Sequence, residues 1–262
     1  SSSSVPSVSH QYDTDYNIKH PDETVNNHTK ESVAMETQKH VISWKNINYT
    51  IGDKKLINDA SGYISSGLTA LMGESGAGKT TLLNVLSQRT ESGVVTGELL
   101  IDGQPLTNID AFRRSIGFVQ QQDVHLELLT VRESLEISCV LRGDGDRDYL
   151  GVVSNLLRLP SEKLVADLSP TQRKLLSIGV ELVTKPSLLL FLDEPTSGLD
   201  AEAALTIVQF LKKLSMQGQA ILCTIHQPSK SVISYFDNIY LLKRGGECVY
   251  FGSLPNACDY FV

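Results

Sequence analysis

Eight consecutive residues have the types and spacing of a phosphate-binding loop: Gly73, Glu74, Ser75, Gly76, Ala77, Gly78, Lys79 and Thr80. Glycine at the first, fourth and sixth positions lets the backbone curl so that amide N–H groups point inward, and the helix predicted after the loop adds the partial positive charge of its N-terminus. Lys79 can reach the β- and γ-phosphates of a nucleotide, the Thr80 hydroxyl can bind Mg²⁺, and Thr81 is included among the candidate contacts. The alternative, a glycine-rich turn that carries Lys-Thr by chance, does not explain the apolar run before the loop or the helical pattern after it.

A second candidate site follows the apolar run 188–192, where Asp193 and Glu194 stand side by side. A wholly apolar strand is expected where both faces of a parallel sheet are covered. At the carboxyl end of that strand, Asp193 can join a Mg²⁺ shell, and Glu194 can accept a proton from an attacking water. The alternative is a strand that ends in a solvated acidic turn, and the complete phosphate loop in the same chain argues against it.

Two further polar residues follow predicted strands. Gln121 comes after the apolar stretch 116–119, and its amide oxygen can touch a metal ion or the attacking water. His226 follows the apolar stretch 219–225, at the strand end where open α/β sheets place their ligands, and its ring can donate a hydrogen bond to a γ-phosphate. Spacing alone is weak support for Gln121, and an isolated histidine in such a place is more often structural.

The elements that must position these residues begin with a strand predicted at 41–51, which is rich in β-branched and aromatic residues. Tyr49 in this strand precedes the phosphate loop closely enough for its ring to stack on adenine, because a bound purine needs a flat apolar face. The alternative is that Trp44 and Tyr49 pack in the strand core.

Turn and capping residues mark two more elements. The stretch 94–106 predicts a hairpin arm with its turn at Asp102-Gly103. Thr130 and Glu133 have the spacing of a capping box, which predicts a helix that runs to Arg142.

Composition narrows the functional classes. The formal net charge of −7 gives no reason to expect nucleic acid as a partner. No apolar run approaches the roughly 18 residues that a membrane-spanning helix needs. Four widely spaced cysteines suggest reduced thiols that pack in the core, rather than a disulfide frame or a zinc site; they are Cys139, Cys223, Cys248 and Cys258.

Residues 1–40 contain serines, histidines and charges with few large apolar groups, so they cannot bury enough surface to offset the entropy lost on ordering. We expect a flexible linker here and a separate domain at 41–262. Four histidines fall in the linker at wide, irregular spacings, which favour solvated residues over a metal site; they are His10, His20, His28 and His40.

Taken together, the motifs resemble the nucleotide-binding domain of an ATP-binding cassette (ABC) transporter. They are the loop at 73–80, Gln121, the Leu-Ser-Pro-Thr-Gln segment at 168–172, Asp193-Glu194, the Ser-Gly-Leu-Asp segment at 197–200, and His226. Their order and spacing agree with the family across 41–262. The resemblance implies the α/β P-loop NTPase fold of ABC ATPases, with a mostly parallel core sheet, an antiparallel β subdomain and a helical subdomain at about 125–182.

A narrower resemblance is to the second (C-terminal) cassette of fungal full-size transporters of the pleiotropic drug resistance group, subfamily G. It rests on the segments 120–125, 178–182, 224–229 and 245–252. In that group the nucleotide domain precedes its membrane domain, and the transported compounds are drugs, lipids and sterols.

The resemblance also implies a role for each matching residue. It implies that Lys79 and the amides of 76–80 bind the phosphates of ATP. It implies that Mg²⁺ is bound by Thr80, Gln121 and Asp193. The residues implied in catalysis are Glu194, as general base, together with Lys79, Gln121 and His226. The residues implied to face a second cassette are Ser169, Pro170, Thr171, Gln172 and Asp200.

One segment departs from the family pattern. The family signature is typically Leu-Ser-Gly-Gly-Gln, whose serine and glycine amides bind the γ-phosphate held by the opposite domain, whereas Pro170 and Thr171 replace the glycines here. Ser169 as cap, Pro170 at the first helical position and Gln172 three residues after the cap still predict a helix. Because Pro170 lacks an N–H that an anion would use, we expect two unequal ATP sites.

The implied function is ATP hydrolysis that powers transport of hydrophobic compounds, with this domain at the cytoplasmic face of a membrane, which is the plasma membrane in that group. The implied partners are transmembrane domains and a second cassette in the same polypeptide.

Two other classes of protein stay open. A soluble ABC ATPase of translation or DNA repair shares the core motifs but usually carries a second cassette or a coiled coil. A P-loop kinase or GTPase does not explain Asp200 and His226 together.

Overall fold

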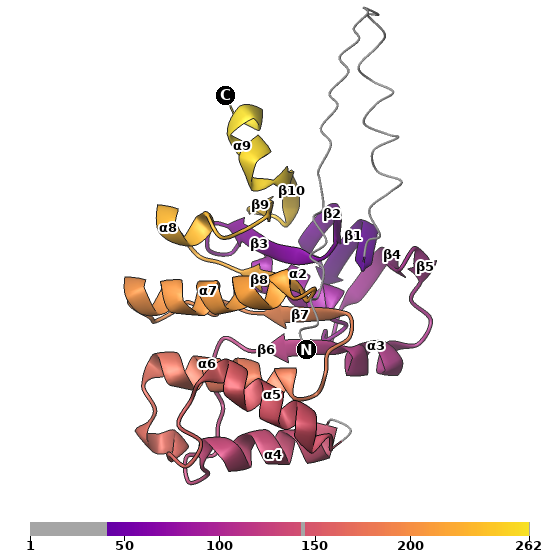
Figure 1. The fold of residues 1–262 in the computed structure, drawn as a ribbon. Helices are drawn as coiled ribbons and strands as arrows, with labels where there is room; N and C mark the ends of the chain where they lie inside the picture. The colour runs from indigo at the N-terminus through magenta and orange to yellow at the C-terminus, as the bar shows by residue number, and fades with distance from the viewer. Residues whose placement is uncertain (1–40, 143–144, 262) are drawn as a thin grey trace, which may run out of the picture. The chain divides into compact units, whose positions relative to one another are not determined.

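A six-stranded sheet lies at the centre of the part of the chain that the structure describes. The computed structural model describes residues 41–142 and 145–261, without the side chain of Cys258. In spatial order the strands are β10 (Glu247–Ser253), β9 (Asn238–Lys243), β3 (Gly67–Gly73), β8 (Ala220–Thr224), β7 (Leu189–Leu192) and β6 (Ile116–Val119). All neighbouring strands are parallel except β10 and β9. The carboxyl ends of β3, β8, β7 and β6 therefore lie side by side along the same end of the sheet (Figure 1).

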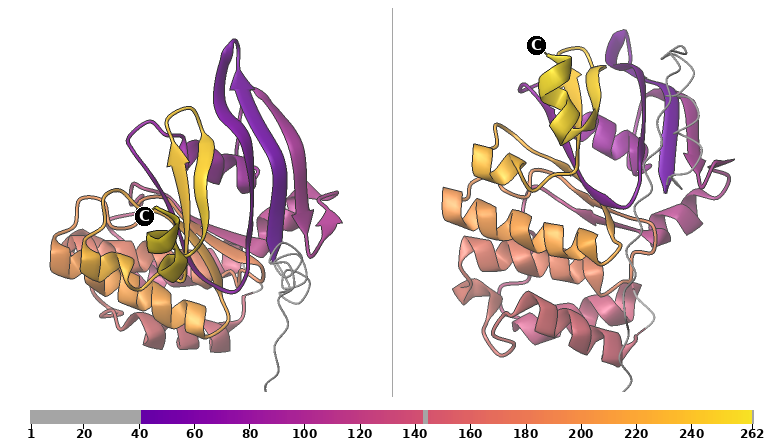
Figure 2. Two further views of the ribbon diagram at one scale, coloured as in Figure 1. Left: turned by 90° about the horizontal axis from the view of Figure 1, so that it is seen from above. Right: turned by 45° about the horizontal axis from the view of Figure 1, so that its top comes forward.

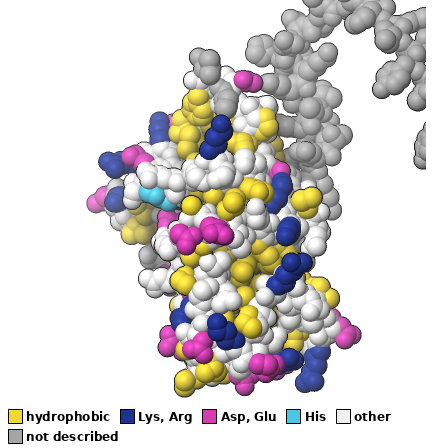
Figure 3. Space-filling model, turned by 60° about the vertical axis from the view of Figure 1, so that its left-hand side comes forward, with side chains coloured by type: hydrophobic (Ala, Val, Ile, Leu, Met, Phe, Trp, Pro, Cys, Tyr) yellow, Lys and Arg dark blue, Asp and Glu magenta, His cyan; other side chains and the backbone are white. Residues whose placement is uncertain are grey.

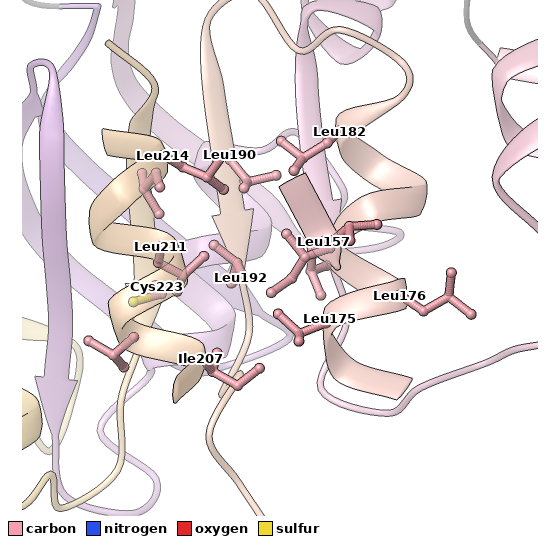
Figure 4. Packing of buried hydrophobic residues seen from close by; sticks show 14 of the residues in the cluster. Leu157, Leu175, Leu176, Leu182, Leu190, Leu192, Ile207, Leu211, Leu214 and Cys223 are labelled. Carbon is pink, nitrogen blue, oxygen red and sulfur yellow. The ribbon is translucent and has the colours of Figure 1, made fainter. Parts of the chain in front are cut away.

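Two hydrophobic cores cover the two faces of this sheet. The helices that contribute most to them are α2 (Lys79–Leu86), α6 (Pro170–Leu182) and α7 (Ala201–Met216). Leu190 and Leu192 of β7 pack in the core that contains α6 and α7, as Figure 4 shows. Leu189 and Phe191, which point the other way, pack in the core that contains α2. Both faces of β7 are buried, as the apolar run predicts.

A second, antiparallel sheet has the strand order β2, β1, β4, β5. Its strands are β2 (Lys54–Ile64), β1 (Ile42–Ile51), β4 (Val94–Ile101) and β5 (Gln104–Pro105). β1 matches the predicted opening strand. Asp102 and Gly103 connect β4 to β5 with φ angles of 47° and 77°, so the predicted two-residue hairpin turn is confirmed.

The predicted helical subdomain contains three helices and a short 3₁₀ turn, which lie together at the bottom of the view in Figure 1. They are α4 (Val131–Arg142), α5 (Arg147–Leu157), η1 (Val165–Asp167) and α6. The capping box at the start of α4 is confirmed: the Thr130 amide donates to Glu133 Oε2 at 2.8 Å, and the Glu133 amide donates to Thr130 Oγ1 at 3.2 Å.

Glu181 connects these helices to the core sheet. Its carboxylate, near the end of α6, accepts hydrogen bonds from both terminal nitrogens of Arg142 at 2.6 and 2.7 Å. It also accepts the backbone N–H of Phe118 in β6 at 3.1 Å. One buried carboxylate thus joins the ends of two helices to the edge strand of the sheet.

The hairpin of β9 and β10 lies beside β2 (Figure 2). The remaining helices are α3 (Ile109–Ser115), α8 (Lys230–Ile233) and α9 (Leu254–Tyr260). The Asn58 amide donates to the Gly246 carbonyl at 3.0 Å. A Cβ atom at Gly246, where φ is 73°, would lie 2.2 Å from the Leu56 carbonyl oxygen, so the approach of the two segments requires glycine.

The surface and the thiols bear on the compositional predictions. On the face drawn in Figure 3, basic side chains are interspersed with acidic and hydrophobic ones. Within residues 41–142 and 145–261, no helix is long and apolar enough to span a bilayer. Cys139 and Cys223 are buried free thiols and Cys248 is partly buried, in agreement with a packing role. The predictions of a flexible linker at 1–40 and of a packed thiol at Cys258 lie outside the described residues.

Candidate functional site

The phosphate loop connects the end of β3 to the start of α2. Gly73, Gly76 and Gly78 have φ angles of 154°, 78° and 103°, so the curled backbone depends on glycine at the three predicted positions. A Cβ atom at Gly73 would also lie 2.4 Å from the Leu242 carbonyl oxygen of β9. The loop is thus packed against the next strand of the sheet and has no room for a side chain there.

Lys79 is folded back over its own loop. The side chain is buried, and its Nζ donates to the carbonyl oxygens of Gly73 at 3.0 Å and Glu74 at 3.1 Å. The ammonium group therefore lies against the backbone that would hold the phosphates, where a phosphate oxygen can replace a carbonyl as its partner.

Asp193 lies within reach of the loop, because β7 and β3 end on either side of β8. Its carboxylate is 6 % exposed, and Oδ1 accepts hydrogen bonds from Thr80 Oγ1 at 3.0 Å and from Thr224 Oγ1 at 2.7 Å. The same Thr224 oxygen accepts the backbone N–H of Glu194 at 2.6 Å. One hydroxyl therefore fixes both acids at the end of β7.

Glu194 turns away from the strand, with a positive φ of 44°, and contacts the glutamine that follows β6: Gln121 Nε2 donates to Glu194 Oε2 at 2.9 Å. Both belong to a pocket of about 500 Å³. Its lining residues are Ser75, Gln121, Glu194, Thr196, Ser197, Gly198 and His226. The fold thus brings together the phosphate loop, the candidate base, the glutamine and the histidine from four separate segments.

The segment at 168–172 starts α6. Ser169 is the N-cap, with the Gln172 amide donating to its Oγ at 3.3 Å, and the Ser169 amide donates back to Gln172 Oε1 at 3.1 Å. Pro170 occupies the first turn, so the predicted capping box and proline position are confirmed. Asp200 caps α7 in the same manner, accepting the Ala203 amide at 2.8 Å.

Comparison with known proteins places this site in a family. The family model described as ABC transporter matches residues 57–197, more than half of the chain. The chain belongs to the ABC transporter family. It is 82 % identical over 229 residues to the ATP-dependent permease AUS1 of Saccharomyces cerevisiae, covering 87 % of this chain and 16 % of that protein.

Other relatives are half identical. The Brefeldin A resistance protein of Schizosaccharomyces pombe is 50 % identical over 242 residues, which are 86 % of this chain and 16 % of that protein. The ATP-dependent permease PDR12 of Saccharomyces cerevisiae is 50 % identical over 238 residues, with shares of 84 % and 16 %. The chain thus spans about a sixth of the length of these curated relatives.

Solved ABC cassettes have the same fold. An ATP-binding cassette of an ABC transporter, MJ1267 in its ADP conformation, superposes with a TM-score of 0.73 at 23 % identity, over 82 % of this chain and 91 % of that one. The cbiO1 protein of Clostridium perfringens, part of the ABC transporter complex cbiONQ, gives a TM-score of 0.75 at 24 % identity, with shares of 85 % and 92 %. At these identities the likeness shows the ABC ATPase fold, as predicted.

The donor set of this ABC cassette fits Mg²⁺. Mg²⁺ prefers oxygen ligands and, at ATP sites, combines one or two carboxylates with phosphate oxygens. Asp193 supplies the carboxylate, the hydroxyl of Thr80 lies 3.0 Å from it, and Gln121 lines the adjoining pocket. Within the described residues no group of three or more His, Cys, Asp or Glu side chains could hold a metal ion.

The position of Tyr49 contradicts the prediction that its ring stacks on adenine. Its ring is 5 % exposed and packs in the core that contains α2, while its Oη donates to the Ser92 carbonyl at 2.6 Å. A ring buried in this manner has no open face for a base. Tyr49 is therefore a strand-core residue, as in the alternative interpretation, and it is left out of the proposed nucleotide site.

Thr224 is the residue that sequence reasoning missed. It is fully buried at the end of β8 and contacts both acids of the ABC site. Its one sequence signal is a hydroxyl at the carboxyl end of an otherwise apolar strand, two residues before His226. Such a threonine is also common in sheets, so the signal is too weak to have found it.

Proposed function

We propose that this chain is an ATP-hydrolysing cassette that powers transport of hydrophobic compounds, such as drugs, lipids or sterols, by a larger membrane protein. The observation that carries the proposal is the contact between Gln121 and Glu194 in a pocket that is also lined by Ser75 of the phosphate loop. The names of its relatives, ATP-dependent permease and Brefeldin A resistance protein, support the transport part.

The proposed mechanism uses residues whose positions are described above. The loop amides and Lys79 bind the phosphates of ATP. Thr80, Asp193 and Gln121 would hold Mg²⁺, which would supply positive charge to offset the negative charge of the phosphates. Glu194 accepts the proton of the attacking water while His226 donates a hydrogen bond to the γ-phosphate. The products are ADP and inorganic phosphate.

A substitution of the general base tests the hydrolysis step. In the full transporter we expect Glu194→Gln to reduce ATP turnover by at least about a hundredfold, since general-base catalysis typically contributes that much. ATP binding, measured as the dissociation constant of a fluorescent ATP analogue, should stay within a factor of three, an allowance for roughly 0.6 kcal/mol. Glu202→Gln, in the first turn of α7 and outside the pocket, is the matched control. Hydrolysis that survives Glu194→Gln would rule out the assigned base.

We further propose that this chain is the second cassette of a full-size transporter of the pleiotropic drug resistance group and works with another cassette in the same polypeptide. Asp200 and residues 169–172 face that cassette across the dimer. Because Pro170 lacks the N–H that a γ-phosphate would accept from this helix N-terminus, the two ATP sites are unequal: Glu194 serves the active one, and residues 169–172 serve a weakened one.

Restoring the glycines tests this asymmetry. Pro170→Gly with Thr171→Gly should leave the turnover of the full transporter nearly unchanged if the second site is also damaged on the side of the partner cassette. A severalfold gain in ATP turnover would show instead that Pro170 and Thr171 alone silence that site.

The membrane part of the proposal has a direct test. We place this domain at the cytoplasmic face of a membrane, the plasma membrane, attached to transmembrane domains. An immunoblot of cell membranes, before and after alkaline carbonate extraction, should give a band far above 28.7 kDa that resists extraction. A band that carbonate releases would instead favour a soluble ABC ATPase of translation or DNA repair.

A further inference from the structure

Lys174 is a buried lysine, and within the described residues its hydrogen-bond partners all lie in the glutamine loop, which we define as residues 120–123. Its side chain is 3 % exposed on α6. The ammonium nitrogen lies 2.7 Å from Asp123 Oδ1, 2.9 Å from the Gln121 carbonyl oxygen and 3.4 Å from the Gln120 carbonyl oxygen. An ammonium group has three donors, so these three acceptors account for its hydrogen bonds.

Lys174 makes hydrogen bonds beyond its ion pair with Asp123. A buried charge is stable only when it is paired and hydrogen-bonded, and Asp123 pairs with Lys174 while also accepting the Ser177 hydroxyl at 2.7 Å. The 2.9 Å bond to the Gln121 carbonyl adds a constraint on the backbone of the residue that enters the site.

Gln121 links Lys174 to the pocket. Gln121 accepts from Lys174 with its backbone oxygen and donates to Glu194 Oε2 at 2.9 Å with its side-chain amide. Lys174 lies two positions after Gln172, the last residue of the segment that starts α6. A series of contacts thus runs from Lys174, in the second turn of α6, through Gln121 to the candidate base.

We propose that Lys174 is a positioning residue for ATP hydrolysis: it fixes the glutamine loop so that the Gln121 amide stays at Glu194. The inference rests on the proposed function, because it assigns Lys174 a role in the same reaction. Lys174 acts through Gln121 and touches neither ATP nor the attacking water. A lysine that only stabilised the fold would change the amount of folded protein but not the rate of each folded molecule.

The test uses the full transporter, purified with its membrane domains and assayed for ATP hydrolysis per folded molecule. We expect Lys174→Met to lower kcat by between about tenfold and a hundredfold, as displacement of a catalytic group by remote changes does, with KM for ATP changed by less than threefold. Lys174→Gln, whose amide can still donate to the Gln121 carbonyl, should recover most of the rate. Lys185→Met, which removes another lysine–aspartate pair near the start of α5, is the matched control and should keep kcat.

A double-mutant cycle separates positioning from folding. If Lys174 acts through Gln121, adding Lys174→Met to Gln121→Ala should lower kcat no further than Gln121→Ala alone. Multiplied effects, or a kcat of Lys174→Met equal to that of the wild type, would overturn the inference. If Lys174→Met fails to fold because it leaves Asp123 unpaired, Lys174→Met with Asp123→Asn removes both charges and should show the same loss of kcat.

Glu194→Gln, assayed beside these variants, distinguishes the two proposals. Loss of turnover in Glu194→Gln with full turnover in Lys174→Met would overturn the role of Lys174 and leave the proposed function standing. Full turnover in Glu194→Gln would overturn the proposed base, and with it the reason to position Gln121.

Discussion

At the scale of single residues, the Thr224 hydroxyl decides how the two acids of the site are held. It donates to Asp193 Oδ1 and accepts the Glu194 amide, at 2.7 and 2.6 Å, in a position with no exposed surface. Two adjacent carboxylates at a strand end repel each other, so hydrogen bonds to their backbone and oxygens are needed to hold them in place. Thr224 supplies that restraint from the neighbouring strand.

Removing this hydroxyl should therefore weaken both the fold and the catalysis. We expect Thr224→Val, which keeps the shape, to lower the free energy of unfolding by about 1–3 kcal/mol, because it leaves the partly buried Glu194 amide without its acceptor. ATP turnover should fall as well, since Glu194 loses a support. Urea unfolding and ATPase assays measure the two effects. Thr224→Ser, which retains the hydroxyl, should stay close to the wild type in both, and an unstable serine variant would point to the methyl group instead.

The site residues that the sequence could predict are those in local motifs. The phosphate loop is contiguous, and Asp193, Glu194, Gln121 and His226 each follow a recognisable apolar strand. Thr224 and Lys174 were missed because their roles depend on partners on other segments. Only the pairing of β7 with β8, and the packing of α6 on the loop after β6, bring those partners within hydrogen-bond distance.

At the scale of elements, the start of α6 shows that the unusual signature segment still forms a sound helix. The capping box between Ser169 and Gln172 satisfies two backbone donors, and Pro170 fills a position that needs none. Losing the glycines therefore changes the chemistry at this helix N-terminus while the helix itself is kept.

The cap has a measurable energy. Ser169→Ala should lower the free energy of unfolding by about 1 kcal/mol, because alanine cannot accept the Gln172 amide. Ser169→Asp, which can accept it, is the control. Urea or thermal unfolding of the full cassette measures the difference, and an alanine variant as stable as the wild type would show that the cap contributes nothing here.

The strands predicted at 41–51, 188–192 and 219–225 match β1, β7 and β8 to within one residue, whereas β2, β9 and β10 are not among the predicted strands, and the direction of Tyr49 is not predicted either. Sequence patterns assign faces by strict alternation, and β1 breaks it: its pairing with β2 shifts between Trp44 and Ile47 and again before Tyr49. Asn46 in this stretch has a φ of 51°. Trp44 and Tyr49 are an odd number of positions apart, so strict alternation would place them on opposite faces. A bulge between them moves the later side chains to the other face, which explains how both can be buried in the same core.

At the scale of the whole molecule, His125 makes stability depend on pH. Its Nε2 lies 2.8 Å from Ser177 Oγ and 3.2 Å from the Arg173 carbonyl oxygen. Burial lowers the pKa of His125 below its ordinary value of 6.5. The hydrogen bond to the Arg173 carbonyl and the negative charge of Asp123 raise the pKa, but by less than burial lowers it. The positive charges of Arg173 and Lys174 lower the pKa further.

The sign of the effect follows from this lowered pKa. Between the folded-state pKa and 6.5 the unfolded chain binds the proton and the folded chain does not, so the stabilisation is fully present above about pH 6.5 and is lost as the pH falls through the folded-state pKa. We expect the wild type to lose more of its melting temperature between pH 7.5 and pH 5.5 than His125→Gln does. Scanning calorimetry at the two pH values makes the comparison, and equal losses would exclude His125 as the source.

The order of strands in the core sheet also governs how the chain can fold during synthesis. Among the described strands, β3, which precedes the phosphate loop, pairs only with β8 and β9, and both are made long after it. While the ribosome translates residues 74–219, this apolar strand therefore has no partner in its sheet, which exposes it to aggregation or to chaperones. A chain cut between α7 and β8 would contain both the phosphate loop and the paired acids yet lack the strand that lies between them.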